Sequence, residues 1–365
     1  MASACPDVPL VVLPSNNVVH CRTRPSPPVA DALAAAVGAL AELRAALLAP
    51  EGADRARQDA ALEAALGSVS HLAAVSRTAP FDTGGLRPIV PNHEYFGVRT
   101  AEVDDAHRTA EISLIVLRAL TDLRHARIDL NDRAAEVRAM ALVLSRLDAG
   151  PGAPVLAPVP GPAAGAPVAA ADDELTRWVI THHFYFVLNL AAATAVTRGI
   201  AAMADEDREA ATAAFRDAAV LVRAFTAAML HSGDMSAPCY DAKVRPTMQP
   251  PAVPAALTGR TQPEHKAFRK AMRRLAGTET ESFAKLAVTD PELALARDAL
   301  LEADLHDLER HIVVTAALVG DDQSIVAADS AGGSAIAMLR TMRHTRAMSY
   351  RELMRFGDPV ELAVQ

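Results

Sequence analysis

The chain has 365 residues, with 36 Lys and Arg against 44 Asp and Glu, which gives a formal net charge of −8. Hydrophobic residues make up 51% and charged residues 22%, a globular composition that excludes a disordered chain and a basic nucleic-acid-binding domain. Aromatic residues are only 4%, whereas Ala and Leu are abundant, so the apolar content favours helices. We therefore expect an all-α fold.

The N-terminal part predicts an arm followed by helices. Residues 1–30 are irregular and rich in proline, with a short strand expected at Leu10–Leu13. Apolar residues then recur at helical spacing, and the prolines and glycines of Arg77–Arg99 indicate a loop. We expect an N-terminal arm and helical region over 1–148, with helices at 29–47, 54–75, 101–120 and 132–147.

Residues 149–171 contain six prolines and four glycines among alanines and valines, which predicts a linker. Residues 172–365 then form the second predicted region, where we expect the chemistry. Helical periodicity returns in this region, and the expected helices are 172–203, 205–231, 262–275, 291–319 and 334–355.

The cysteines and the apolar segments indicate the expected cellular location and whether the chain spans a membrane. Three cysteines, at positions 5, 21 and 239, are too scattered for a disulfide framework. We expect no export signal and a cytoplasmic location, since no basic segment precedes a long apolar one at the start. The apolar run Phe184–Thr197 is shorter than the roughly 20 residues that cross a bilayer, so no membrane span is expected.

Two adjacent histidines stand on the helix expected from residue 172. His182 shares a face with apolar residues, so it is predicted to point into the interior, and His183 lies about 100° away. A buried histidine satisfied by one hydrogen bond is the plainer interpretation. The alternative is that one of the two, and not both, is catalytic.

A third histidine, His311, lies where a predicted helix changes from charged to apolar residues. Asp307 is one turn earlier and could orient its imidazole, or could simply pair with it at the surface. The residues offer neither the paired Glu-x-x-His motifs of a di-iron bundle nor a zinc motif. A cofactor held by one axial histidine in an apolar pocket remains.

Ser330-Ala331-Gly332-Gly333-Ser334 precedes the last predicted helix. Paired glycines allow close approach of a ligand, and the free N–H groups of a helix start favour a carboxylate. An ordinary loop in which Ser334 caps the helix is the alternative.

These segments together resemble the histidine-ligated, haem-dependent aromatic oxygenases, the superfamily of tryptophan 2,3-dioxygenase. Ile180-Thr181-His182-His183-Phe184-Tyr185 is similar to the segment that carries the distal histidine in that superfamily. His311, followed by Gly332-Gly333-Ser334, is similar to its proximal histidine and glycine-rich loop. The resemblance covers about residues 172–350 and leaves the first half without a counterpart.

Two branches of the superfamily are nearest. Tyr240-Asp241-Ala242-Lys243-Val244-Arg245-Pro246 resembles monodechloroaminopyrrolnitrin synthase, and Glu264-His265 after the Arg-Pro and Pro-Pro pairs resembles the bacterial haem-dependent tyrosine hydroxylases. The Gln and Glu that follow the distal histidine in the dioxygenase are replaced here by His183 and Phe186, which argues against strict tryptophan dioxygenation. In a relative whose haem is attached through a thioether, the cysteine belongs to a His-x-x-x-Cys motif. In this sequence Thr315 stands at the position of that cysteine, four residues after His311.

The resemblance implies a fold of the tryptophan 2,3-dioxygenase type and an oxygenase of secondary metabolism that binds non-covalent haem b. His311 would be the axial ligand, and His182 or His183 the distal acid or base. Arg245 and Arg260, with the Gly332–Ser334 backbone, would bind the substrate carboxylate, and Tyr185 would line the substrate site.

The expected substrate is a tyrosine- or tryptophan-type amino acid, and the oxidant is dioxygen or hydrogen peroxide. Oxidative rearrangement of a halotryptophan is the second enzymatic alternative. A haem-free helical binding protein with structural histidines is the third. No nucleic acid or membrane partner is expected, and the oligomeric state is left open, with a homodimer as the candidate.

Overall fold

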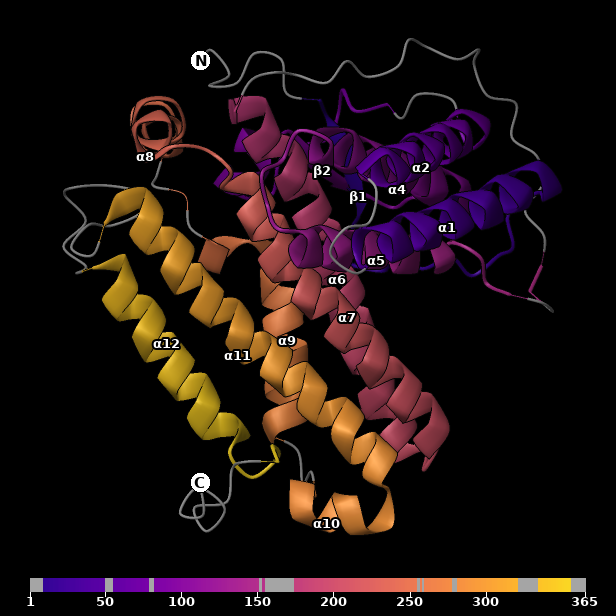
Figure 1. Cartoon of the computed structure of the whole chain (residues 1–365), viewed down its shortest axis with the longest axis vertical. Coiled ribbons are helices and arrows are strands. Elements are labelled where there is room, and N and C mark those ends of the chain that lie inside the picture. The colour runs from indigo at the N-terminus through magenta and orange to yellow at the C-terminus, as the bar shows by residue number, and fades with distance from the viewer. Residues whose placement is uncertain are drawn as a thin grey trace.

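The computed structural model describes residues 9–49, 55–78, 82–150, 153–154, 174–254, 257, 259–277, 281–320 and 334–355. Within these ranges the chain is almost entirely helical, which confirms the predicted all-α class. The predicted linker 149–171 falls mostly outside the described residues. Figure 1 shows the N-terminal helices gathered at one end of the long axis and the C-terminal helices extending toward the other.

The N-terminal half is a group of packed helices with one small parallel pair of strands. The pair joins β1 to β2 in the register Val11↔Val98. The predicted loop over 77–99 contains a short helix and the first two residues of β2, which sequence periodicity missed because each element is only four or five residues long. The elements are β1 (Val11–Pro14), α1 (Pro27–Leu47), α2 (Arg55–Val75), α3 (Pro91–Tyr95), β2 (Val98–Ala101), α4 (Asp105–Leu123) and α5 (Leu130–Ser145).

The C-terminal half contains the longest helices. Around the central α6 and α7, α9 packs on α6, α11 packs on α7, and α12 packs on α11 (Figure 1). The elements are α6 (Glu174–Ala204), α7 (Arg208–Ser232), α8 (Ala237–Cys239), the π-helix η1 (Tyr240–Val244), the 3₁₀ helices η2 (Arg245–Met248) and η3 (Gly259–Thr261), α9 (Pro263–Gly277), α10 (Phe283–Thr289), α11 (Pro291–Val319) and α12 (Ala335–Tyr350).

Aspartate and serine caps start several of these helices. The carboxylates of Asp104, Asp129 and Asp207 each accept a hydrogen bond from the backbone N–H three residues later, at the starts of α4, α5 and α7. Asp290 does the same for α11. Such caps satisfy N–H groups that the first helical turn leaves without partners, so the polar residue before each apolar stretch sets where the helix begins.

Helices α6 and α7 pack closely because Gly199 has no side chain. A Cβ atom at this position would lie 2.5 Å from the ring of Phe215 on α7. Phe215 itself is fully buried, so its ring has little room to move and a larger residue at 199 would separate the two helices. The close pair forms the centre of the core.

Helix α6 extends well beyond the apolar run Phe184–Thr197 seen in the sequence. By length and composition it could cross a membrane, with a mean hydropathy of 1.5 in its most apolar window, but 61% of that window is buried inside the fold. Contacts with α7, α9 and α4 cover it, as expected for the core helix of a helical bundle.

A buried ionic cluster joins the two halves of the chain. His231 on α7 is completely buried, with Nδ1 3.1 Å from a carboxylate oxygen of Glu136 on α5 and Nε2 2.9 Å from Asp122 on α4. Arg177 on α6 donates to the same Asp122 oxygen at 2.9 Å. Burial alone would lower the pKa of His231, but the two carboxylates outweigh it and raise the pKa to about 9.

Candidate functional site

Two histidines from different helices, His265 on α9 and His311 on α11, lie within electrostatic range of each other. His311 is one of the groups that act on the pKa of His265. Both side chains are half-buried, and neither ring makes a hydrogen bond within the described residues. Within the described residues, the two imidazoles have no hydrogen-bond partner, and Arg346 of α12 acts on the pKa of both.

Both imidazoles are held neutral. Burial, reinforced by the nearby cations Arg269 and Arg346, lowers the pKa of His265 to about 3. Burial and Arg346 lower the pKa of His311 to about 4. A neutral imidazole has a free lone pair, which is the form that binds a metal. At neutral pH these two rings are thus available as ligands without the loss of a proton.

A buried carboxylate organises the cations beside this pair. Asp304, only 1% exposed, accepts hydrogen bonds from Arg269 at 2.6 and 2.9 Å, from Arg346 at 3.1 Å and from the Tyr350 hydroxyl at 2.8 Å. Burial would raise the pKa of Asp304, but the two arginines outweigh it and keep that pKa below its usual value. The cluster fixes α9 and α12 against α11.

Asp307 was a candidate either to orient His311 or to pair with it at the surface, but its hydrogen bond goes elsewhere. Its Oδ1 accepts from the Thr226 hydroxyl of α7 at 3.3 Å, and no hydrogen bond joins it to His311 within the part of the chain that the structure describes. Burial and the neighbouring Asp304 raise the pKa of Asp307 to about 7. Tyr185 faces the same region, since burial and the charges of Asp307 and Asp304 raise its pKa, while Arg346 acts in the opposite direction.

His182 lies in an aromatic group next to Tyr185. Its ring stacks on Phe96 at 4.5 Å between centroids and 16° between planes, and lies 4.2 Å from the Trp178 ring and 6.3 Å from that of Tyr185. Nδ1 donates to the Trp178 carbonyl at 2.5 Å. Burial lowers the pKa of His182 to about 4, so it is neutral and Nε2 carries the free lone pair.

His183 has a different environment. It is 1% exposed, and its Nε2 donates to the Phe96 carbonyl at 2.6 Å. Burial lowers its pKa to about 3. The remaining nitrogen, Nδ1, is buried without a hydrogen bond. His183 therefore holds the 90–97 segment against α6, whereas His182 presents a nitrogen that a ligand could reach.

Of the other predicted site residues, Arg245 and Ser334 have described side chains, and each makes a contact of its own. Arg245 is on η2, where its Nη1 donates to Asp241 at 3.1 Å. Arg260 lies in η3, and its side chain is outside the described part. Ser334 caps α12, where its hydroxyl accepts from the Ala337 N–H at 3.3 Å. Gly332 and Gly333 lie outside the described residues.

Sequence reasoning did not select His265 or the segment beside it as site residues. The pair Glu264-His265 was visible in the sequence, but nothing in its spacing placed it opposite His311. Glu264 itself binds His93 of α3, with 3.0 Å between Oε1 and Nε2 and both side chains buried. The short helix α3 lies in a segment whose prolines and glycines predicted only a loop, so the contact had no sequence signal.

Comparison with known proteins gives the class of this all-helical chain. The chain is a member of the haem-dependent aromatic oxygenase superfamily. Within it, the profile of the family described as SfmD 3-methyl-L-tyrosine peroxygenase matches residues 17–296, and the chain belongs to that family.

One relative and one solved structure are similar to the chain. The 3-methyl-L-tyrosine peroxygenase of Streptomyces lavendulae is 33% identical over 212 residues, which are 56% of this chain and 54% of that protein. The chain thus aligns with about half the length of the curated relative. A crystal structure of reduced SfmD, soaked with sodium hydrosulfite, has a TM-score of 0.49 at 24% identity and covers 80% of this chain and 97% of that one.

The family match corrects the extent of the expected resemblance. The resemblance had been placed at about residues 172–350, with no counterpart for the first half. The match instead begins at residue 17 and ends at residue 296. It therefore includes His182, His183 and His265 and the whole N-terminal helical group, and it stops before His311.

Proposed function

We propose that this protein is a haem-dependent peroxygenase or oxygenase that adds oxygen to a tyrosine-type amino acid in natural-product biosynthesis. The observation that carries the proposal is the pair of neutral imidazoles, His265 and His311, neither of which makes a hydrogen bond within the described part of the chain. The name of the Streptomyces lavendulae relative supports an aromatic amino acid substrate of the methyltyrosine class. Hydrogen peroxide, or dioxygen with a reductant, is the proposed oxidant.

The residues fit a haem group. His311 and His265 each offer a neutral nitrogen, and Trp178, Tyr185 and Phe96 supply aromatic surface nearby. Thr315, buried one turn after His311, has no thiol that could form a thioether, which supports non-covalent haem b with His311 as axial ligand. When bound, haem supplies the redox chemistry that protein side chains lack.

The chain's own residues would bind and orient the substrate. Nε2 of His182 would accept a hydrogen bond from the substrate phenol. With a pKa of about 4, this imidazole is a weak base, so it orients the hydroxyl rather than removing its proton in the ground state. Tyr185 lies beside it, and the aromatic walls exclude water from the ring to be oxidised.

The first test is the absorption spectrum of the protein purified from haem-supplemented cells. A Soret band near roughly 400 nm, typical of haem proteins, should appear in the wild type and be lost in His311→Ala. His265→Ala should shift the band. His306→Ala is the matched control, since His306 is exposed on the same helix, and its spectrum should equal that of the wild type.

The second test is turnover. The haem-loaded protein is supplied with 3-methyl-L-tyrosine, L-tyrosine or L-tryptophan and hydrogen peroxide, and products are analysed by mass spectrometry. The proposal expects a product with one added oxygen from a tyrosine-type substrate. A folded wild-type protein that takes up no hemin would overturn it and favour the helical binding protein, and a rearranged halotryptophan product would favour the second enzymatic alternative.

A further inference from the structure

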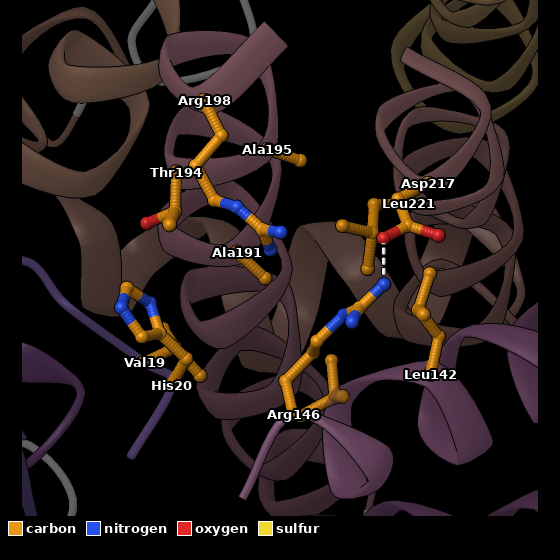
Figure 2. Close-up of a pocket in the computed structure, with 11 residues that line it drawn as sticks. Val19, His20, Leu142, Arg146, Ala191, Thr194, Ala195, Arg198, Asp217 and Leu221 are labelled. Atoms are coloured by element: carbon orange, nitrogen blue, oxygen red, sulfur yellow. Dashed lines mark hydrogen bonds and ion pairs between the residues drawn. The ribbon is translucent and has the colours of Figure 1, made fainter. Parts of the chain in front are cut away.

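A pocket on another side of the molecule lies where the N-terminal arm crosses α5, α6 and α7. Val19 and His20 form one wall, and Figure 2 shows Arg198 and Arg146 extending toward the centre from opposite ends. The pocket is an open groove, and its empty space of about 380 Å³ includes open solvent. It begins at Ala191, nine residues and about 14 Å along α6 from His182, so it is separate from the histidine site.

The charges in this pocket do not cancel. Arg146 forms an ion pair with Asp217. Arg198 makes no hydrogen bond or ion pair with any other described residue, and its side chain is exposed at the pocket. With His20 neutral, two guanidinium groups less one carboxylate leave a charge of +1. The pocket therefore matches a ligand with a single negative charge.

His20 lies in the positive electrostatic field of these arginines and places a polar side chain in the pocket wall. Burial and the charges of Arg198, Arg108 and Arg22 lower its pKa, because each of these cations disfavours a second positive charge. Its Nδ1 is buried without a hydrogen bond. A buried nitrogen in the wall of a pocket with no protein partner is costly unless a ligand or water satisfies it.

Apart from Thr194, whose hydroxyl donates to the Leu190 carbonyl at 2.9 Å, the rest of the lining is apolar. Leu142, Ala191 and Leu221 face the pocket beside the charged groups. The arm that forms the outer wall is held in place, because the Cys21 N–H donates to the Arg146 carbonyl at 3.1 Å and the Thr23 N–H donates to Asp105 at 2.9 Å. The pocket thus combines a cationic end with an apolar wall on a fixed framework.

We propose that this pocket binds a small organic monoanion, with its carboxylate on Arg198 and His20 and an apolar tail along Leu142, Ala191 and Leu221. A guanidinium offers the paired N–H groups that a carboxylate accepts. The site is independent of haem and of the proposed oxygenase activity. A bound carboxylate would link the arm to α6 and stabilise the folded protein.

The test uses isothermal titration of the full-length, haem-loaded protein with sodium hexanoate at constant ionic strength. We expect saturable binding at one site per chain. Arg198→Gln should weaken it about tenfold or more, through loss of the charged hydrogen bonds. Ala191→Leu, which fills the pocket without changing charge, should weaken it similarly. Arg216→Gln is the matched control, since Arg216 pairs with Glu292 on the surface, and should change the affinity less than about twofold.

Two further probes define the ligand class. Hexanol, which lacks the charge, should bind at least about tenfold more weakly than hexanoate. Inorganic phosphate should not compete with hexanoate at equal concentration. Absence of saturable hexanoate binding would overturn the proposal, as would equal binding by Arg198→Gln and Arg216→Gln. Phosphate competition as strong as that of hexanoate would reject the organic carboxylate in favour of a simple anion site.

Discussion

Nε2 of His183 lies 2.6 Å from the carbonyl oxygen of Phe96, a hydrogen bond that joins residues 87 positions apart. The ring of the same Phe96 stacks on the adjacent His182 at 4.5 Å. One residue of the N-terminal half therefore fixes both histidines, one through its backbone and the other through its side chain. The two histidines consequently have separable roles.

Replacing the two histidines should separate stability from function. His183→Leu removes the donor for a buried carbonyl, so the free energy of unfolding should fall by about 1–3 kcal/mol. His182→Phe should retain the haem spectrum but lower turnover, because the phenyl ring can still stack on Phe96 while the substrate phenol loses its acceptor. Urea unfolding and kcat measurements check this. Unchanged turnover in folded His182→Phe would contradict the proposed role of His182.

The buried ionic cluster around His231 predicts that the folded protein loses stability at alkaline pH. The pKa of His231 is raised to about 9 in the folded protein against about 6.5 when unfolded. The stabilisation is therefore complete below pH about 6.5 and is lost as the pH rises through about 9, a change on the order of 3 kcal/mol. Unfolding free energies measured between these pH values should show this decline.

His231→Gln is the corresponding variant. It leaves the buried Glu136 without its cation, although Arg177 still pairs with Asp122, which should cost about 3–5 kcal/mol at neutral pH and remove most of the alkaline decline. His71→Gln, on the exposed face of α2, is the control and should behave as the wild type. An alkaline decline of equal size in His231→Gln would assign it to other groups.

Asp304 should matter far more for stability than a surface carboxylate. Asp304→Asn leaves Arg269 and Arg346 buried without their counter-charge, so we expect a loss of about 3–5 kcal/mol in unfolding free energy. Glu292→Gln, which breaks the exposed pair with Arg216, should cost less than about 1 kcal/mol. Chemical denaturation of both variants tests the difference, and similar losses would contradict the buried cluster as the cause.

Haem affinity should be nearly independent of pH between 6 and 8. The pKa values of His311 and His265, about 4 and about 3, leave both rings neutral across this range. Two rings with an ordinary pKa near 6.5 would instead bind about 16-fold more weakly at pH 6, since only about a quarter of each would be neutral. Soret titrations of the apoprotein, corrected with a hemin blank, distinguish the cases.

The haem should also be removable. Because Thr315 stands one turn after His311 and carries no thiol, we expect acidified organic solvent to extract all the haem and leave colourless protein. Retention of haem on the denatured chain would show a covalent bond to another residue and contradict the non-covalent assignment.

The periodicity of the sequence predicted most long helices to within a few residues, as at α2, predicted from 54 to 75 and observed at Arg55–Val75. Local interactions determine where such helices lie in the chain, since apolar spacing and N-terminal caps act within one helix. His182, His183 and His311 could be selected in the same way, because their unusual positions on apolar helices are visible along the chain.

What the sequence determined by itself is the all-α class, the positions of most long helices and the superfamily. The helices depend on residues close together in the chain, and the superfamily is recognised from several short motifs taken in order. Tertiary structure alone decided that His265 of α9 lies near His311, that Phe96 holds both His182 and His183, and that Arg198 meets His20. These pairs are 46 to 178 residues apart, by subtraction of their numbers. Only helix packing around Gly199 and the buried ionic clusters brings them together, and no local pattern encodes that packing.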